Sequence, residues 1–346
     1  MSNRDSFSRR QFLQRCTTGL GSFAFIPAPL RSKHSLLESD SPVLGRVLFD
    51  NVQTYEQPDL NGAKASIRNF NEVLQLSQPI KGALLNGHNA IWFVTPQNEF
   101  IQSTSIQIVQ NQLNIVQENV LKSGRLAEVT VPFTDAWPAD KQGSRAHQIF
   151  FYGSLHWIYG LGKDAENKIF YLVIEDRWNE TYYVDATHMS IIEDEELDPI
   201  APVDDLKQKK IIVDTTRQML FSYQDERLVM ACGVSTGQFN NGTNLSTPPG
   251  EYFINYKRPS RHMVHSDKVG INDSELYGVP WVSYFTDSGI AFHGTYWHND
   301  YTHPRSHGCV NMPIQAAKWL YLWSDPIIAP RAKKHTSRYG TTVEVI

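Results

Sequence analysis

Short runs of β-branched and aromatic residues, separated by turn formers, constrain the fold of this chain more than any other feature. They recur from Leu44 to Ile192 and again from Lys210 to His293. Aromatic residues make up 12% of the chain, and residues of this kind favour strands over helices. Turn residues between short strands are typical of small β-barrels and β-sandwiches. The sequence therefore predicts a mainly β protein.

A single segment predicts an α-helix, near the C-terminus. Pro313 suits a first helical turn, and the apolar run from Ile314 to Trp323 follows it. Asn311 is placed to cap the unpaired backbone N–H groups at the start of this helix.

Composition excludes several classes of protein. The 346 residues are 41% hydrophobic and 20% charged, as in ordinary soluble globular proteins, so fibrous and wholly disordered classes fall away. Lys and Arg number 32 against 36 Asp and Glu, which argues against a nucleic-acid partner because such proteins need a basic surface. No uninterrupted apolar run approaches the roughly 20 residues of a membrane-spanning helix.

The N-terminus resembles a twin-arginine export signal. Ser-Arg-Arg-Gln-Phe-Leu at 8–13 precedes a mildly apolar stretch from Cys16 to Leu30. A merely basic, disordered N-terminus is the alternative. We expect residues 1–33 to direct export, which places the protein outside the cytoplasm, in the periplasm or cell wall. No clean small-x-small cleavage site follows, so an uncleaved signal is the one membrane attachment that we expect.

The exported body is acidic and poor in cysteine. Removing residues 1–33 leaves 26 basic against 35 acidic residues, and only Cys232 and Cys309 remain. Two cysteines exclude a disulfide-stapled scaffold. Cys232 lies in an apolar strand and is expected to pack in the core, although a bridge to Cys309 is also open.

Two β modules are predicted, at 44–120 and 121–193. Trp92-Phe93-Val94 leads to the segment 100–106, and Tyr171-Leu172-Val173 leads to the similar segment 183–189 about eighty residues later. This spacing suggests a tandem repeat of a small β-barrel that resembles bacterial Src-homology-3-like modules. Two unrelated β hairpins are the alternative, because short apolar runs coincide easily.

An acidic, proline-punctuated stretch at 194–207 is predicted to be a solvated linker. The pattern changes character after it. We therefore expect a separate C-terminal domain at 208–346.

Ser-His-Gly-Cys-Val-Asn at 306–311 is the most informative segment of that domain, and His293-Gly294-Thr295 lies 16 residues upstream of the cysteine. A thiol becomes nucleophilic when it ionises, and a nearby imidazole or a helix N-terminus favours the thiolate. Cys309 is expected to have both within reach. Gly308 lacks a side chain, so backbone amides near the cysteine could approach a substrate carbonyl and stabilise an oxyanion.

Other interpretations of these residues stay open. A cysteine is more often a small core residue than a nucleophile, but the polar neighbours of Cys309 do not make a core strand. The histidines at 293, 298, 303 and 307 could bind zinc with Cys309, yet their spacing is not a usual paired-ligand pattern. We expect neither a metal nor a cofactor.

With Val-Ser-Thr-Gly at 234–237 and Thr-Pro-Pro-Gly-Glu-Tyr at 247–252 upstream, these motifs resemble the L,D-transpeptidase catalytic domain, also called the YkuD domain. The resemblance covers about 208–346 and implies a β-sandwich or barrel with one helix after the cysteine. It implies that Cys309 is the acyl-accepting nucleophile. His293 would be its general base, oriented by the backbone carbonyl of Gly294, and His307 and Gly308 would shape the oxyanion and substrate pocket.

The resemblance also implies a set of substrate-binding residues. Ser306 and Asn311 would support the catalytic loop, and three aromatic residues would line the donor site: Trp281, Tyr284 and Trp297. The polar segment from Ser260 to Tyr277 is expected to act as a lid, with its histidines His262 and His265 in solvent.

The function implied is a peptidoglycan crosslinking transferase that takes stem peptides as substrates, releases D-alanine and is inhibited by carbapenem-type β-lactams. An L,D-carboxypeptidase and a protein-to-wall anchoring enzyme share the same acyl-enzyme and stay open as alternatives. A non-catalytic wall-binding or zinc protein is a further alternative. The two β modules would bind wall polymer or pace access to the site, which rests on fold analogy.

Overall fold

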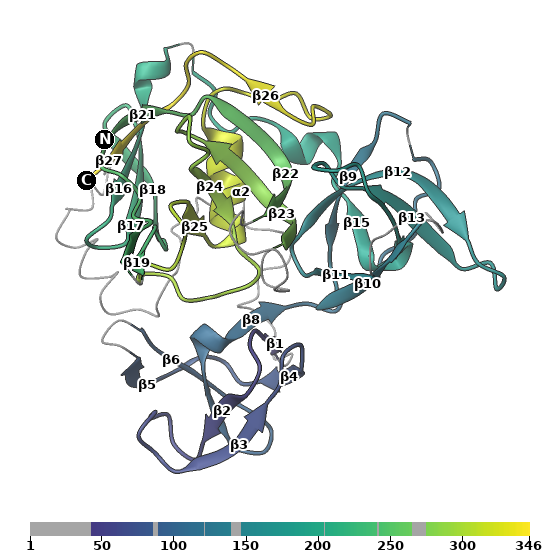
Figure 1. The fold of residues 1–346 in the computed structure, drawn as a ribbon, viewed down its shortest axis with the longest axis vertical. Coiled ribbons are helices and arrows are strands. Elements are labelled where there is room, and N and C mark those ends of the chain that lie inside the picture. The colour runs from purple at the N-terminus through teal and green to yellow at the C-terminus, as the bar shows by residue number, and fades with distance from the viewer. Residues whose placement is uncertain are drawn as a thin grey trace, which may run out of the picture.

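The computed structural model describes residues 43–346 except 86–88, 121, 140–146, 204, 241 and 265–274. The expected export segment lies outside these residues. Strands dominate the described part, which confirms the predicted mainly β class (Figure 1). The predicted helix is also present as α2 (Ile314–Trp323). No helix within the described residues is long and apolar enough to cross a membrane.

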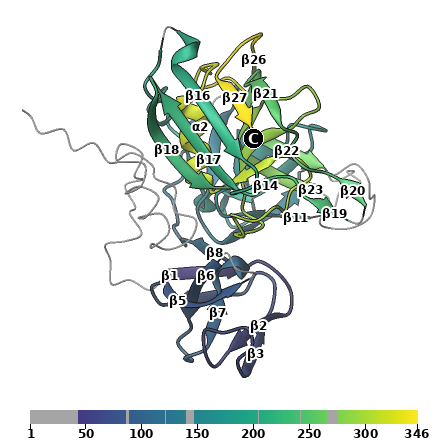
Figure 2. The same ribbon diagram turned by 90° about the vertical axis from the view of Figure 1, so that its left-hand side faces the viewer.

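An N-terminal unit, residues 43–109, holds two sheets and forms the lower part of the molecule in Figures 1 and 2. One sheet has the order β4-β1-β8 and the other β3-β2-β7-β6-β5. Their bounds are β1 (Val43–Val47), β2 (Val52–Tyr55), β3 (Lys64–Arg68), β4 (Val73–Leu76), β5 (Ile80–Leu85), β6 (Asn89–Val94), β7 (Phe100–Gln102) and β8 (Ile106–Val109).

A middle unit, residues 125–191, forms one seven-stranded sheet of order β11-β10-β14-β13-β12-β9-β15. Its strands are β9 (Arg125–Val129), β10 (Phe133–Pro138), β11 (Gln148–Phe151), β12 (Leu155–Lys163), β13 (Ile169–Ile174), β14 (Thr181–Asp185) and β15 (Met189–Ile191).

The two similar sequence segments have the same local structure. Each runs from a strand through a one-turn 3₁₀ helix into a strand, with η2 (Ser103–Ser105) before β8 and η3 (Ala186–His188) before β15. In each, the residue before the turn caps it: the side chains of Gln102 and Asp185 accept hydrogen bonds from backbone N–H groups two residues on. The surrounding sheets differ between the units, so the tandem-barrel interpretation and its boundaries stay predictions.

The acidic stretch after the middle unit is more than a solvated linker, which corrects the sequence-based expectation. Glu193 and Glu196 form a capping box around η4 (Asp194–Leu197), and Leu197 is buried in the core of the C-terminal unit. The N–H of Ile200 donates to the carbonyl oxygen of Leu322 at 3.0 Å. The apolar residues among the acids attach this segment to the last helix.

The C-terminal unit, residues 206–346, stacks two five-stranded sheets of orders β18-β17-β16-β27-β21 and β25-β24-β23-β22-β26. Helix α2 lies against β23 and β24, and its side chains share one core with both sheets. The elements are η5 (Leu206–Gln208), β16 (Lys209–Asp214), β17 (Met219–Gln224), β18 (Arg227–Gly233), β19 (Phe239–Asn240), β20 (Thr243–Asn244), β21 (Gly250–Phe253), β22 (Tyr256–Val264), β23 (Glu275–Tyr284), β24 (Ala291–Gly294), β25 (Val310–Met312), β26 (His335–Thr336) and β27 (Thr342–Val345).

Buried lysines hold the C-terminal end of α2. The last carbonyls of a helix have no partner within the helix and need donors from elsewhere. Lys209 donates to the carbonyl oxygen of Trp323 at 2.6 Å. Burial lowers the pKa of the Lys257 ammonium to about 7. Its Nζ donates to the carbonyl oxygens of Tyr321 at 2.5 Å, Ser324 at 2.8 Å and Pro326 at 3.0 Å.

Replacing Lys257 by methionine should therefore destabilise the C-terminal unit. The change keeps the volume but leaves three carbonyls without their donor, which predicts a loss of about 3 kcal/mol in the free energy of unfolding, measured in urea. Lys210→Met is the control, since Lys210 is half-exposed and pairs with Glu344 at the surface. Its expected cost is below about 1 kcal/mol, and equal losses in both variants would contradict the capping role.

Candidate active site

A short parallel pairing of β24 with β25 positions the predicted catalytic residues. His293 lies opposite Asn311 in this register, and Phe292 lies opposite Val310. Cys309 directly precedes β25, two residues before Asn311. Because side chains alternate along a strand, Cys309 and His293 belong to the same face at neighbouring positions. The strand register thus places the two predicted catalytic residues at neighbouring positions of one sheet.

The thiol of Cys309 is partly exposed and surrounded by apolar groups. It packs against the buried cluster of Val279, Val282 and Ala291, together with Tyr284 and Trp297. Its Sγ donates to the carbonyl oxygen of Gly289 at 4.0 Å. Burial raises the pKa of the thiol, and a hydrogen bond with the backbone of Ala291 opposes this effect.

Cys232 differs from Cys309 in how far its thiol is exposed to solvent. Both cysteines are free, but Cys232 is fully buried in the core, as predicted from its strand. Burial raises its pKa to about 12. A bridge between the two cysteines is therefore not formed, and the thiol available for chemistry in the C-terminal unit is that of Cys309.

The His293 imidazole is buried and neutral. Its Nδ1 lies 3.2 Å from the carbonyl oxygen of Gly294, the orienting contact that the sequence resemblance implies. A carbonyl only accepts, so Nδ1 carries the proton and Nε2 is left as the acceptor. Burial lowers the pKa of His293 to about 4, partly offset by the Gly294 hydrogen bond. The ring of Trp297 lies beside it, with centroids 5.7 Å apart.

The expectation of a resting thiolate is not supported by this geometry. Helix α2 begins at Ile314, and β25 separates its N-terminus from Cys309, so the helix does not start at the thiol. Among the contacts of the described residues, Cys309 bonds to Gly289 rather than to His293. Desolvation disfavours the charged form of both groups. Burial therefore favours the neutral thiol of Cys309 and the neutral imidazole of His293.

The loop before Cys309 is closed by Ser306. Its Oγ accepts from the N–H of Gly308 at 3.1 Å and donates to the carbonyl oxygen of Cys309 at 2.5 Å. Gly308 has φ of +121°, a conformation that favours glycine. The Gly308 amide is bonded to Ser306 within the loop, and the expected role of the backbone amides around Cys309 in holding an oxyanion stays a prediction.

The two upstream motifs hold this loop from outside. The Oγ1 of Thr247 accepts from the N–H of Gly237 at 3.0 Å and donates to the carbonyl oxygen of Gly308 at 2.7 Å. A Cβ at Gly237 would stand 2.8 Å from the Cα of Gly308 and 2.0 Å from the carbonyl oxygen of Leu245. Ser235 forms an antiparallel bridge with Asn311. The motifs that carry the resemblance therefore meet in space.

Asn311 has a different role from the predicted helix cap. Helix α2 has Pro313 at its N-cap position and no side-chain cap hydrogen bond. The Asn311 side chain lies 2.8 Å from Nε2 of His298 instead, inside the protein. His298 is buried, and burial lowers its pKa to about 3. Sequence reasoning treated His298 only as a possible zinc ligand, although its position after Trp297 was a usable signal.

Some of the remaining predicted site residues lie near Cys309, and one lies in the core. Tyr284 and Trp297 pack against the same apolar cluster as Cys309, and the side chain of His307 is exposed. Trp281 is only 1% exposed and packs in the core near Tyr321, so it does not line a donor site. The backbone of Trp281 has a φ of +61°, which interrupts the regular alternation of β23, and its side chain packs in the large core, whereas Val282 belongs to the cluster against which Cys309 packs.

The expected lid is only partly described. Its ends belong to β22 and β23, and the part at 265–274, with His265, lies outside the described residues. His262 is not in solvent, which corrects the expectation. It is 1% exposed, with Nδ1 2.8 Å from Oε2 of Glu175, because β22 packs against the middle unit.

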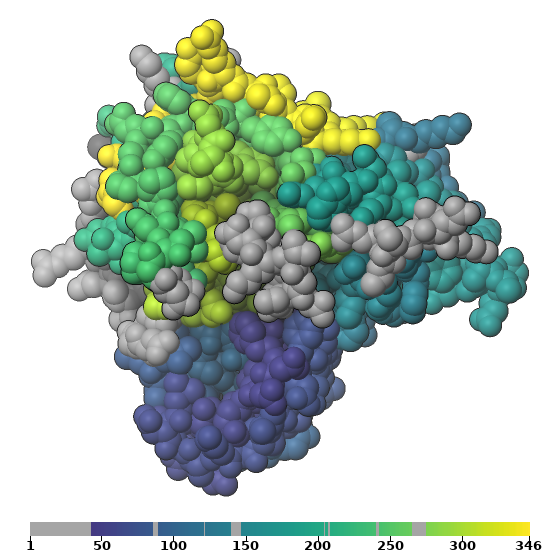
Figure 3. Space-filling model, in the orientation of Figure 1, coloured from purple at the N-terminus to yellow at the C-terminus, as the bar shows by residue number. Residues whose placement is uncertain are grey.

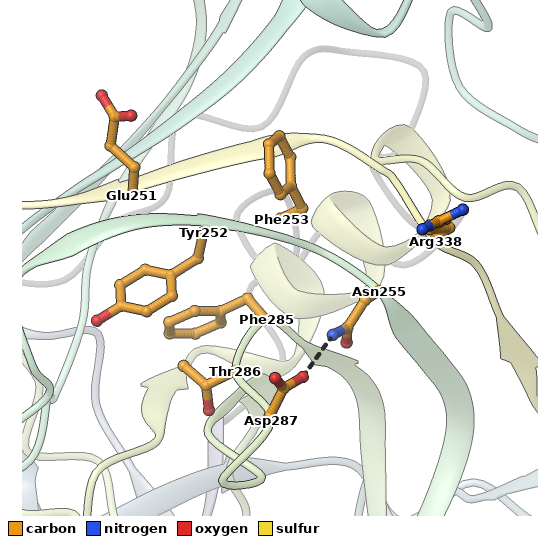
Figure 4. A pocket seen from close by; sticks show the side chains of 8 residues that line it. All are labelled: Glu251, Tyr252, Phe253, Asn255, Phe285, Thr286, Asp287 and Arg338. Carbon is orange, nitrogen blue, oxygen red and sulfur yellow. Dashed lines mark hydrogen bonds between the residues drawn. The ribbon is translucent and has the colours of Figure 1, made fainter.

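A pocket of about 280 Å³ lies between residues of β21 and the turn that follows β23 (Figure 4). Thr286 and Asp287 line it, and Gly289 from the same turn contacts Cys309. None of the predicted site residues line it. The full lining is Glu251, Tyr252, Phe253, Asn255, Phe285, Thr286, Asp287 and Arg338. Within the described residues no three His, Cys, Asp or Glu side chains are grouped to hold a metal.

The fold and the site define a class: a β-sandwich domain that presents a free thiol next to an oriented, neutral imidazole. Residues 208–345 match the family model of the L,D-transpeptidase catalytic domain, YkuD. This part of the chain therefore matches the L,D-transpeptidase catalytic domain, as the sequence resemblance predicted.

Solved structures of L,D-transpeptidases are also similar to this chain. One from Xylanimonas cellulosilytica is 24% identical, covers 40% of this chain and 60% of its own, and has a TM-score of 0.29. A mutant enzyme from Enterococcus faecium is 19% identical, with coverages of 40% and 50% and a TM-score of 0.30. L,D-transpeptidase 3 from Mycobacterium tuberculosis, solved with a faropenem-derived adduct, is 16% identical, with coverages of 49% and 75% and a TM-score of 0.33.

The chain spans only 50–60% of the length of the three first-ranked L,D-transpeptidase structures that it matches. No curated protein matches it. Because the TM-scores of these structures are low, the assignment of the domain rests on the family model alone.

The protonation state of the thiol predicts its reactivity. Alkylation proceeds through the thiolate. Because burial raises the pKa of Cys309 above its ordinary value, the rate of alkylation by iodoacetamide should keep rising through about pH 9, measured by intact mass in protein that carries Cys16→Ser. A plateau that begins near neutral pH would instead show a thiolate–imidazolium pair and contradict the neutral site.

The contact between Gly237 and the catalytic loop predicts a second effect. Gly237→Ala places a methyl group against Gly308 and should shift Cys309, which predicts a fall of about tenfold in the acylation rate. Gly160→Ala is the control, since its nearest neighbour would be Leu172 at 3.8 Å. Equal rates for Gly237→Ala and the unmodified protein would contradict the holding role.

Proposed function

We propose that the protein crosslinks peptidoglycan outside the cytoplasm by acyl transfer through Cys309. The observation that carries this proposal is the strand register that places the partly exposed Cys309 near His293, whose Nδ1 faces the Gly294 carbonyl and leaves Nε2 as the acceptor, in a region that matches the L,D-transpeptidase domain. The twin-arginine-like N-terminus supports export to the compartment where the substrate lies.

The first half-reaction forms the acyl-enzyme. The Cys309 sulfur attacks the carbonyl between the third residue of a tetrapeptide stem and its terminal D-alanine, while the thiol proton moves to Nε2 of His293. The carbon–nitrogen bond then breaks, and the amine of D-alanine leaves with that proton. The stem remains bound to sulfur as a thioester, and His293 is neutral again.

The second half-reaction transfers the acyl group. The side-chain amine of another stem attacks the thioester carbonyl and gives a proton to His293, and the sulfur leaves and takes that proton back. The product is a direct crosslink between two third-position residues. All proton transfers are made by the thiol and the imidazole of this chain.

The surroundings of the thiol suit an acyl-enzyme. Tyr284 and Trp297 pack against the same apolar cluster as Cys309, and apolar surface here supports an amine rather than water as acceptor. We also propose that the N-terminal and middle units bind wall polymer, on their resemblance to Src-homology-3-like modules.

The experiment that tests the nucleophile is intact-mass analysis after exposure to a carbapenem. Mycobacterium tuberculosis L,D-transpeptidase 3 was solved with a faropenem-derived adduct, and another L,D-transpeptidase in complex with imipenem, which supports β-lactams as probes. We expect one adduct, lost in Cys309→Ala and kept in the control Cys232→Ala. An adduct that survives in Cys309→Ala would contradict the assignment.

Product analysis then tests the acceptor. Tetrapeptide stems should give a crosslinked dimer and free D-alanine in equal amounts. Release of D-alanine with only the shortened tripeptide would show water as the acceptor and an L,D-carboxypeptidase instead.

A further inference from the structure

We infer that Arg46, in the N-terminal unit, is a positioning residue for the active site, because it holds the connection that links His293 to Cys309. The inference rests on the proposed function in one respect: its main measurement is acylation of Cys309. It gives the N-terminal unit a role in catalysis besides any binding of wall polymer.

The Arg46 guanidinium is 1% exposed and joins the two units. Its Nη2 donates to the carbonyl oxygen of Tyr296, at 2.6 Å, 250 residues away in the sequence. Two side chains of its own unit fix the other nitrogens. Nε and Nη2 donate to Oε1 of Gln107 at 3.0 and 2.7 Å, and Nη1 donates to Oδ1 of Asn71 at 2.8 Å.

The middle unit completes the same junction. The ring of Phe151 lies under the guanidinium, 4.3 Å from its carbon, and stacks on the ring of Tyr296 with centroids 5.5 Å apart. Nε2 of Gln107 donates to the carbonyl oxygen of Tyr152 at 3.0 Å. The Arg46 guanidinium is therefore the point where all three units of the protein meet.

No carboxylate is among the hydrogen-bond partners that the described residues give this charge. Burial lowers the pKa of Arg46 to about 9, so placing the guanidinium here costs free energy that neutral acceptors only partly offset. A buried apolar residue would join the units at lower cost. Arginine adds a rigid, planar guanidinium, whose N–H groups hold one backbone carbonyl in a fixed place.

Further anchors follow along the same connection. Nδ2 of Asn299 donates to the carbonyl oxygens of Ser103 at 3.3 Å and Ile106 at 3.1 Å, both in the N-terminal unit. The guanidinium of Arg305 lies over the ring of Phe49, 5.6 Å from its centroid. Figures 1 and 3 show the N-terminal unit seated beneath the C-terminal unit.

The anchored segment is next to the reacting groups. Trp297 follows Tyr296 directly, lies with its ring centroid 5.7 Å from that of His293, and packs against the same apolar cluster as Cys309. A displacement of Tyr296 would therefore move Trp297 and change the environment of both His293 and Cys309. Displacements of about 1 Å can cost up to about a hundredfold in rate.

The test compares Arg46→Met, Arg46→Lys and the control Arg68→Met in the full chain. Arg68 lies in the same unit and pairs with Glu99 at 2.8 Å, far from the C-terminal unit in sequence and contacts. The rate of carbapenem acylation is measured over a range of carbapenem concentrations. The curve gives the saturating rate and, as a separate parameter, the concentration at which the rate is half of that value. We expect Arg46→Met to lower the saturating rate by about tenfold, with partial rescue by Arg46→Lys and less than a twofold change in Arg68→Met.

A variant in the C-terminal unit separates loss of the contact between the units from misfolding of the N-terminal unit. Asn299→Ala leaves that unit unchanged and should lower the saturating rate in the same direction. Unchanged rates in both Arg46→Met and Asn299→Ala would overturn the inference.

Failure of the proposed function gives a different result. In that case the unmodified protein forms no carbapenem adduct at all. The inference is then decided by the pH profile of iodoacetamide alkylation of Cys309, which should differ in Arg46→Met and match the unmodified protein in Arg68→Met. Identical profiles in all three proteins would overturn it.

Discussion

The active site depends on one constraint, the parallel pairing of β24 with β25. Two parallel strands cannot be joined by a tight turn, so the chain has to leave Gly294, cross back and enter Val310 in the same direction. Here the crossing segment contains no helix to stiffen it. Each of its ends carries one reacting group, His293 before it and Cys309 at its close. The geometry of the pair is therefore only as fixed as the contacts that hold this segment.

Those contacts come from three directions. Ser306 closes the last turn internally, Thr247 and Gly237 support it from two loops of the same unit, and Arg46 holds its first half from another unit. The same packing buries His293 and part of Cys309. Burial disfavours the charged forms of the thiol and the imidazole, which suits a nucleophile that is activated only when a substrate carbonyl is in place. It also protects a free thiol from unwanted oxidation while it waits.

The sequence predicted the parts of this site that are encoded locally. The cysteine motif, the upstream His-Gly and the orienting carbonyl of Gly294 follow from short segments, and helix α2 follows from Pro313 and its apolar run. Each rests on neighbours within a few residues. The mainly β class followed for the same reason, because strand propensity and turn residues act over short distances.

The errors concern the direction of side chains and contacts between distant segments. Trp281 is expected at the donor site, yet its left-handed backbone conformation interrupts the alternation of β23 and its side chain packs in the core. Asn311 was given a capping role, but the pairing of β25 aims it at His298. The contact of Arg46 with Tyr296 spans 250 residues and carries no local signal. Such features depend on strand register and on the docking of whole units, which a single sequence does not encode in any short pattern.

The central claim is that the resting site holds a neutral imidazole with its proton on Nδ1, facing a neutral thiol. The ¹⁵N chemical shifts of the His293 ring at neutral pH test it directly, with Cys309→Ser as the comparison. The account predicts the shifts of a neutral Nδ1–H tautomer, essentially unchanged when the sulfur is removed. An imidazolium signature that disappears in Cys309→Ser would show a preformed ion pair and contradict the account.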